Sequence, residues 1–212
     1  ESAEIRNINR MYFGNEKGVL TERACYGIYN LIKTENVDIT MDMHEGSPEF
    51  LYLDCTMVNK HSDNSLAMSI ASYMCLSMEF DDLPMRAEYS GIRSYGLSHR
   101  SLGDNTESMM TLMETYNPSM GPLHGKMDDD LIINGNEPNY YKAHQDGFIY
   151  FDVPEEGYPL VNRVARHILT IAYLAEGFSE YVPERCISFD TNLGTYEDMV
   201  EMGLGGILKS TN

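Results

Sequence analysis

The sequence predicts an α/β fold, a three-layer sandwich in which helices flank a central mixed, largely parallel sheet. Two observations support this prediction. Some segments alternate apolar and polar residues with the period of two that a half-buried strand needs, and others repeat apolar residues at helical spacing; the two kinds follow one another along the chain. The chain has 212 residues, of which 42% are hydrophobic. That is enough for one substantial core, so we expect a single domain over residues 1–212, with 178–212 as a C-terminal extension.

The first predicted helix covers the segment LTERACYGIYNLIKTEN, which begins at Leu20. Thr21 suits the N-cap position, and Glu22 lies in the first turn. The apolar residues of the segment repeat at helical spacing, at Ala24, Ile28, Leu31 and Ile32. This helix leads directly into a strand.

The segment VDITMDMHEGSPEF, from Val37 to Phe50, is typical of a strand that ends at a turn. Its apolar side chains fall on one face and its polar side chains on the other, at Val37, Ile39, Met41 and Met43 against Asp38, Thr40, Asp42 and His44. The strand stops at Gly46-Ser47-Pro48. Open α/β sheets place ligands and catalytic groups where strands end, so His44 is a candidate for the functional site.

Five later segments complete the prediction of elements. FLYLDCTMV is rich in residues that favour strands, and DNSLAMSIASYMCLSM has the polar start and the apolar density of a buried helix. GIRSYGLSHRSLGDNTE is interrupted by glycines and is predicted as a loop. SMMTLMETYNPSMG has the length of a strand, although its Met and Leu residues leave a helix open. The clearest helix is LVNRVARHILTIAYLAEGF, which stops at Gly177 and carries an apolar stripe of Val164, Ile168, Ile171, Ala172 and Ala175.

The composition excludes several classes of function. A formal net charge of −18 would repel the nucleic-acid backbone and anionic membranes over much of the surface, so we expect neither as a partner. No apolar run approaches the ~20 residues of a membrane helix. No signal segment opens the chain, although a removed one would be invisible, and we expect a cytoplasmic protein. The four cysteines have no CxxC spacing, which excludes a zinc ribbon and a dithiol motif; we expect mostly buried thiols.

Three short clusters carry the residue types that chemistry needs. They are NINR with Asn9 and Arg10, DMHE with His44, and GLSHR followed by METYNP with Arg100 and Glu114. Each cluster alone is only weak evidence for a functional site. A lone His at a strand end is more often a hydrogen-bonded structural residue than a metal ligand, and an Arg beside an Asn is usually a solvated surface pair.

Together and in this order, the clusters resemble the succinylglutamate desuccinylase/aspartoacylase family, a branch of the zinc carboxypeptidase superfamily. The shared pattern is an Asn-Arg before an aromatic-Gly stretch, here NRMYFG, then a helix and a strand that ends in DMH. A GLSHR loop and the sequence ETYNP follow, with Gly121 and Gly125 after them. The resemblance covers roughly Ile8 to Tyr141, and its specificity lies in the ordered combination.

The resemblance implies a zinc carboxypeptidase-like fold and assigns roles to the matching positions. His44 would be a ligand of Zn²⁺, contributed from a strand end. Asn9 and Arg10 would bind the carboxylate of the substrate or its neighbouring polar groups, which suits the two-pronged guanidinium. Glu114 would be the general base that takes a proton from zinc-activated water and delivers it to the leaving amine. Arg100 would stabilise the developing oxyanion or bind a second carboxylate.

One part of the family pattern is absent from this sequence. The first two zinc ligands of the family come from a His-x-x-Glu motif upstream of Asn-Arg, and no His here has a Glu three residues later. A catalytic zinc normally takes three protein ligands. Three explanations are open: an N-terminal segment lies outside the given chain, which the abrupt start favours; a second polypeptide supplies the ligands; or the chain has lost its metal.

Other polar residues near the clusters have competing interpretations. Asp42 either orients the His44 imidazole from behind or faces solvent. Glu45 points away from His44 along a strand and is predicted as a surface charge. His99 either hydrogen-bonds the loop backbone or reaches a metal. The remaining histidines are expected to be structural or exposed: His61, His124, His144 and His167.

The sequence therefore predicts a zinc-dependent amide hydrolase that acts on small N-acyl amino acids or on C-terminal peptide bonds. Two alternatives come from other classes. One is a non-catalytic module that binds a small molecule or a carboxylate after losing the metal, and the other is a purely structural subunit. The sequence leaves the oligomeric state and the side chain or acyl group of the substrate open.

Overall fold

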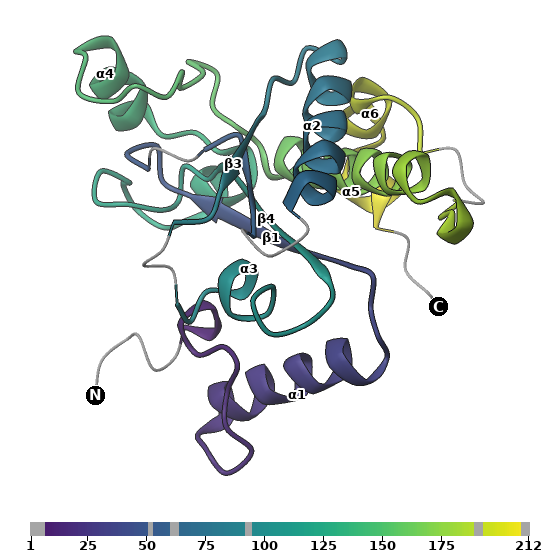
Figure 1. Cartoon of the computed structure of the whole chain (residues 1–212). Coiled ribbons are helices and arrows are strands. Elements are labelled where there is room, and N and C mark those ends of the chain that lie inside the picture. Colours follow the sequence, from purple (N-terminus) through teal and green to yellow (C-terminus); the bar gives the residue numbers. More distant parts are fainter. Residues whose placement is uncertain (1–6, 51–52, 60–63, 92–94, 189–192, 209–212) are drawn as a thin grey trace. The chain divides into compact units, whose positions relative to one another are not determined.

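A computed structural model describes residues 7–50, 53–59, 64–91, 95–188 and 193–208 (Figure 1). Its sheet has four strands in the order β1-β4-β2-β3. The strands are β1 (Ile39–Gly46), β2 (Cys55–Val58), β3 (Arg86–Tyr89) and β4 (Met109–Tyr116). The sheet is mixed, and together with its helices it confirms the predicted α/β class.

Helices occupy most of the remaining described chain. The α-helices are α1 (Leu20–Thr34), α2 (Asn64–Phe80), α3 (Ser98–Ser101), α4 (Pro138–Gln145), α5 (Leu160–Tyr181) and α6 (Tyr196–Ile207). Three short helical segments accompany them in the described chain: η2 (Ile8–Arg10) before α1, η3 (Asp130–Asn134) before α4, and η4 (Pro183–Arg185) between α5 and α6. The sequence prediction assigned no element to the segments that form α4, α6 and β3. Strand β3 and helix α4 are short, and α6 has a non-helical backbone at Gly203, which interrupts its periodicity.

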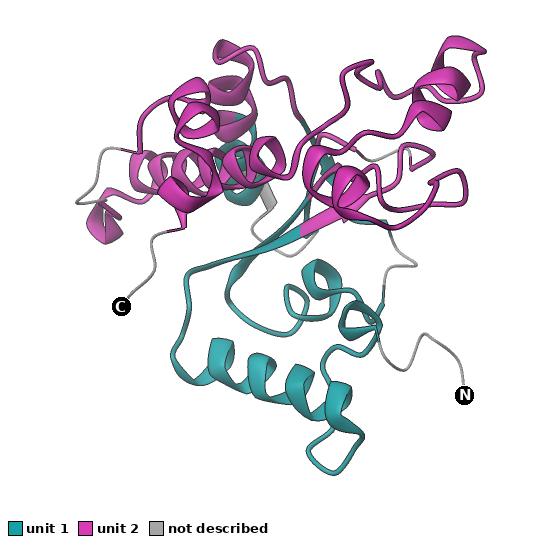
Figure 2. Ribbon diagram, turned by 180° about the vertical axis from the view of Figure 1, so that it is seen from behind, with its two compact units in different colours: residues 1–43, 56–72, 86–113 teal, residues 44–55, 73–85, 114–212 magenta. Residues whose placement is uncertain are grey.

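The chain divides into two compact units that are interleaved along the sequence (Figure 2). Unit 1 contains residues 1–43, 56–72 and 86–113, and unit 2 contains residues 44–55, 73–85 and 114–212. Two of the strands, β1 and β4, begin in unit 1 and end in unit 2. As a result, the carboxyl ends of both strands belong to unit 2.

Strands β1 and β4 lie side by side and run parallel. At one end, the Met109 amide donates to the Asp38 carbonyl at 2.8 Å, and at the other the Asn117 amide donates to the Gly46 carbonyl at 2.8 Å. The same offset at both ends is the pattern of a parallel pair. The strand predicted after Val37 is therefore confirmed, and it ends at Gly46 as expected.

The predicted burial of the apolar face of β1 is wrong. Met43 is 51% exposed, and Ile39 and Met41 are only half-buried. The physical reason is position, since β1 is the edge strand of the described sheet whereas β4 has a strand on either side. In β4 every residue from Met110 to Tyr116 is buried, which confirms the strand prediction for this segment.

Unit 1 packs α1 against the start of β4. Its buried residues are Ile32, Leu102 and Met110, and partly buried Ile28 and Val37 pack against them. The helix already begins at Leu20, so Thr21 lies inside its first turn and is not the N-cap. The carboxylate of Glu22 instead accepts a hydrogen bond from the Val19 amide at 2.8 Å, satisfying a donor that the helix itself leaves open.

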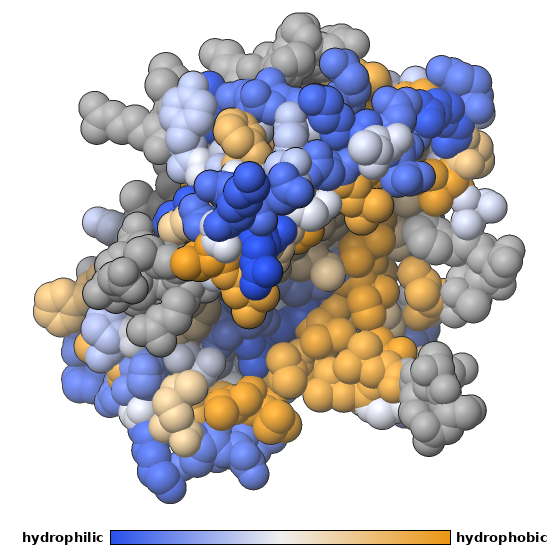
Figure 3. All heavy atoms as spheres, turned by 90° about the horizontal axis from the view of Figure 1, so that it is seen from below, coloured by the Kyte–Doolittle hydropathy of each residue, from blue (hydrophilic) through white to orange (hydrophobic). Residues whose placement is uncertain are grey.

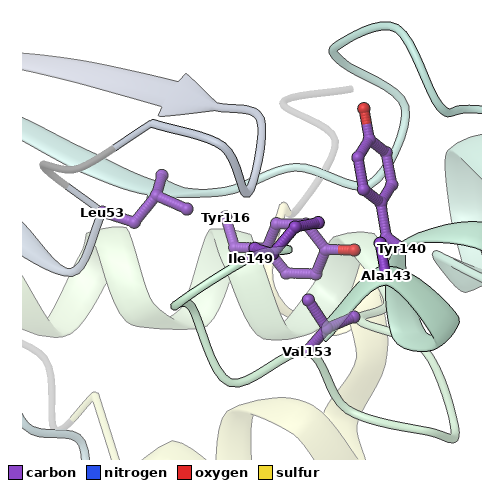
Figure 4. Close-up of a cluster of buried hydrophobic side chains, with 6 residues drawn as sticks. All are labelled: Leu53, Tyr116, Tyr140, Ala143, Ile149 and Val153. Carbon is purple, nitrogen blue, oxygen red and sulfur yellow. The ribbon is translucent and has the colours of Figure 1, made fainter. Parts of the chain in front are cut away.

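Unit 2 contains two hydrophobic clusters. One surrounds Tyr116 at the end of β4 (Figure 4) and consists of Leu53, Tyr116, Tyr140, Ala143, Ile149 and Val153. The other joins α5 to α6 and consists of Met78, Leu83, Ala165, Leu169 and Met199. The first cluster anchors the strand end that follows Glu114.

Helix α5 is confirmed, but two details of its prediction are wrong. It continues through Gly177 to Tyr181, because Gly177 is buried within the helix and no turn is formed there. Its buried face is also rotated from the predicted apolar stripe, and Ile171 is 36% exposed. The buried face instead includes Arg163, Arg166 and His167, and the guanidinium groups of both arginines bind partners inside the unit.

Smaller predictions have mixed outcomes. The buried helix after residue 63 is confirmed as α2, and the segment predicted as a loop around GLSHR contains the short helix α3. Cys25, Cys55 and Cys75 are buried as expected, but Cys186 is exposed.

The described surface carries apolar as well as polar side chains. Figure 3 shows both kinds on one face, where apolar areas lie beside hydrophilic ones. Large apolar residues with high exposure include Leu20, Phe80, Phe148 and Tyr150. Among the helices of the described residues, none combines the length and the hydropathy needed to cross a membrane.

Candidate functional site

His44 and Glu114 meet at the carboxyl ends of neighbouring strands in unit 2. The Nδ1 atom of His44 lies 3.5 Å from Oε1 of Glu114. The His44 side chain is 27% exposed and the Glu114 side chain 9%. The site thus has one half-accessible imidazole beside one buried carboxylate, at the edge where parallel strands end.

Glu114 is an unusual residue for its position. It lies in a strand that is buried along nearly its whole length, and its second oxygen, Oε2, is buried without a hydrogen-bond partner in the described part of the chain. Burying a carboxylate oxygen without a partner costs free energy. A buried group that stability does not explain is a candidate for function.

The neighbouring residue Glu45 is not the isolated surface charge that the sequence predicted. Its Oε2 accepts from a guanidinium nitrogen of Arg163 at 2.9 Å and from the side-chain amide of Asn117 at 2.5 Å. Arg163 is 2% exposed and also donates to the Ile132 carbonyl at 2.8 Å. The prediction failed because Arg163 is 118 residues away along the chain, beyond any local pattern.

His167 lies next to the site, although the sequence analysis placed it among the structural or exposed histidines. It is 8% exposed and makes a hydrogen bond to the backbone of His44. Burial, followed by the charges of Arg166, His44 and Arg163, lowers the pKa of His167 to about 4. The spacing of Arg163 and His167 by one helical turn was the available signal.

This low pKa predicts a pH-dependent stability. An unfolded His takes up its proton near 6.5, whereas folded His167 does so near 4. Between these two pH values the unfolded chain binds more protons than the folded chain. The free energy of unfolding is therefore highest above pH 6.5 and falls as the pH drops toward 4. We expect His167→Phe to flatten this part of the curve, measured by urea unfolding at pH 7 and pH 5 in protein treated with a chelator. If the wild type and His167→Phe lose the same stability between pH 7 and pH 5, the low pKa of His167 is not the cause of the pH dependence.

The predicted substrate-binding residues belong to unit 1. Asn9 is 2% exposed, and its Oδ1 accepts from the Ser98 amide at 2.6 Å. Arg10 is exposed and donates to the Asn9 carbonyl at 2.7 Å. Arg100 pairs with Asp104 at 2.5 Å and lies 5.3 Å from the centre of the Tyr95 ring. Asn9 thus holds the GLSHR segment in place, and the Asp104 carboxylate already engages the Arg100 guanidinium.

The other polar candidates have local partners. The Asp42 carboxylate hydrogen-bonds the Ser98 hydroxyl in unit 1. His99 is fully buried on α3. His124 is exposed and lies 2.8 Å from the Gly125 carbonyl, and His144 pairs with Asp152 at 3.3 Å. His61 lies outside the described residues.

The described residues do not fit a complete catalytic zinc centre. Within the ranges that the structure covers, no group of three or more His, Cys, Asp or Glu side chains is placed to hold a metal ion. A catalytic zinc takes three protein ligands, and of these the sequence assigned only His44. What the arrangement can do by itself is move a proton between an imidazole, a carboxylate and a water molecule.

Comparisons with protein-family models, with curated proteins and with solved structures found no match to this chain. The resemblance to the succinylglutamate desuccinylase/aspartoacylase family therefore stays a prediction from the ordered sequence motifs.

Proposed function

We propose that this chain carries the proton-transfer centre of a zinc-dependent amide hydrolase with a zinc carboxypeptidase-like fold, similar to the succinylglutamate desuccinylase/aspartoacylase family. Its substrates would be N-acyl amino acids or peptides cleaved at their C-terminal bond. The observation that supports the proposal is the pairing of His44 with the buried Glu114 at 3.5 Å, at the ends of two adjacent parallel strands.

Glu114 would act as the general base and then as the general acid. Its carboxylate accepts a proton from water as the water oxygen bonds to the amide carbon. It returns that proton to the amide nitrogen as the carbon–nitrogen bond breaks, so protons balance over the cycle. Of the three residues that the motifs assign to binding, Arg10 is exposed and would bind a carboxylate of the substrate. Asn9 would support it from a buried position, and Arg100 would bind a second anionic group only by exchanging its partner Asp104.

The zinc ion that the motifs imply would be held by His44 and would need further donors, because the described residues place no group of three donors together. Those donors would come from residues outside the described ranges, from a further segment or from a second polypeptide. The described residues lack a complete set of metal ligands, and this observation also favours one alternative, a module that binds carboxylates without turnover.

Metal analysis and an activity assay separate these proposals. Zinc per chain is measured in protein purified without added metal, beside His44→Ala. About one zinc that is lost in the variant, with hydrolysis of N-acetyl or N-succinyl amino acids, supports the hydrolase. No zinc and no turnover, with ligand affinity that falls in Arg10→Ala, supports the binding module. Zinc that stays bound in His44→Ala contradicts the proposed role of His44.

A further inference from the structure

The last residues of β1 are held in place by polar groups of other segments of unit 2. The Gly46 carbonyl accepts a hydrogen bond from the backbone amide of Asn117, and the Glu45 carboxylate is bound by the side chains of both Asn117 and Arg163. His44 is bound through its backbone by His167. Each of the three residues at this strand end therefore has a buried partner outside β1.

Two of these partners come from the same face of α5. Arg163 and His167 are four positions apart, so their side chains lie one above the other on the helix. They are 2% and 8% exposed, which is rare for such residues without a specific partner. Because one binds Glu45 and the other binds His44, α5 contacts two consecutive residues of β1.

The ring nitrogens of His167 make few polar contacts, which limits the roles that this side chain can have. Its Nδ1 is buried with no hydrogen-bond partner within the described ranges, so its polar contact with β1 is the one to the His44 backbone. A residue that only filled space at this position would be apolar, since an unpartnered ring nitrogen is costly to bury.

We propose that His167 is a positioning residue for His44. By holding the backbone of His44 at the strand end, it sets the distance at which the imidazole faces the Glu114 carboxylate, 3.5 Å in this structure. The catalytic consequence rests on the proposed function, whereas the effect on the geometry of His44 does not. His167 touches neither Glu114 nor a reacting group in this assignment, and acts through His44 alone.

Three variants test the proposal. His167→Phe keeps a ring of similar size and removes the hydrogen bond. His167→Gln keeps a side-chain donor at about the position of the distal ring nitrogen. Thr170→Val is the matched control, because Thr170 is a fully buried residue of the same helix whose hydroxyl hydrogen-bonds only the Arg166 carbonyl in the described structure.

The primary readout is the ring ¹H–¹⁵N spectrum of His44, recorded in the folded protein without substrate and assigned with His44→Ala. We expect the chemical shifts of the His44 ring to differ from those of the wild type in His167→Phe, to lie close to the wild-type values in His167→Gln, and to equal them in Thr170→Val. If turnover is found, kcat should fall about tenfold in His167→Phe with KM within about twofold.

The outcomes separate the two proposals. Unchanged His44 resonances in folded His167→Phe overturn the positioning role, whatever the activity. Equal shifts in His167→Phe and Thr170→Val also overturn it, because they show a general disturbance of α5. Should His167→Phe fail to fold, His167→Gln takes its place, and His44 resonances that move no further in it than in Thr170→Val likewise overturn the positioning role. If the His44 resonances shift in His167→Phe but the wild-type protein shows no turnover, the positioning role of His167 stands and the proposed hydrolase function is wrong.

Discussion

Replacement of Glu114 by Gln is expected to remove amide hydrolysis, with kcat lowered by about 10²- to 10⁴-fold, the usual contribution of a general acid–base. The amide of Gln has nearly the same shape as the carboxylate but takes up no proton at neutral pH. Stability should not suffer. Oε2 of Glu114 has no hydrogen-bond partner in the described structure, so a neutral group there removes the cost of burying a charge. We expect an unfolding free energy within about 1 kcal/mol of the wild type, or above it.

Glu137 provides a matched control for this experiment. Both glutamates are 6% exposed. The Glu137 carboxylate, however, accepts from the backbone amides of Gly125 and Asn139 and caps the start of α4. Glu137→Gln should therefore lower the unfolding free energy by about 1–2 kcal/mol and leave turnover unchanged. If the two variants lose stability alike and turnover alike, Glu114 has no special chemical role.

Removal of the Glu45 carboxylate is expected to lower the free energy of unfolding by about 3 kcal/mol, because it leaves the buried charge of Arg163 without its ion-pair partner; the Glu45 side chain itself is 27% exposed. In Glu45→Ala the guanidinium of Arg163 remains buried, with its side chain 3% exposed and its carboxylate partner gone. The Ile132 carbonyl still accepts one of its hydrogen bonds, but it carries no compensating charge. Urea unfolding with a global probe measures the change.

A double-mutant cycle distinguishes the ion pair from a general effect of truncation. Arg163→Met in the Glu45→Ala background should recover part of the lost stability, because the buried charge disappears and the volume is retained. Glu88→Ala is the surface control: Glu88 pairs with Arg86 at 3.7 Å, and its side chain is 48% exposed. Its loss should cost at most about 1 kcal/mol. A Glu45→Ala effect no larger than that would show that the pair with Arg163 contributes little to stability.

The elements with strong periodicity were predictable from the sequence. The strand that contains His44, the strand that contains Glu114 and helix α5 all appear where the pattern placed them, because hydrophobic periodicity is a local property. Helix α3, which has four residues, and helix α6, whose backbone is not helical at Gly203, escaped prediction. The buried face of α5 was also not predicted, because the burial of Arg163 and His167 depends on partners that lie more than 100 residues away along the chain.

The sequence alone determined the α/β class, the end of β1 at Gly46 and the choice of His44 and Glu114 as candidates. Only the tertiary structure decided that β1 is an edge strand with Met43 exposed, that His44 and Glu114 lie 3.5 Å apart, and that Arg163 and His167 support the end of β1. The physical reason is that local periodicity specifies which face of an element is apolar. Strand order and the pairing of buried charges arise from long-range packing, which no short segment encodes.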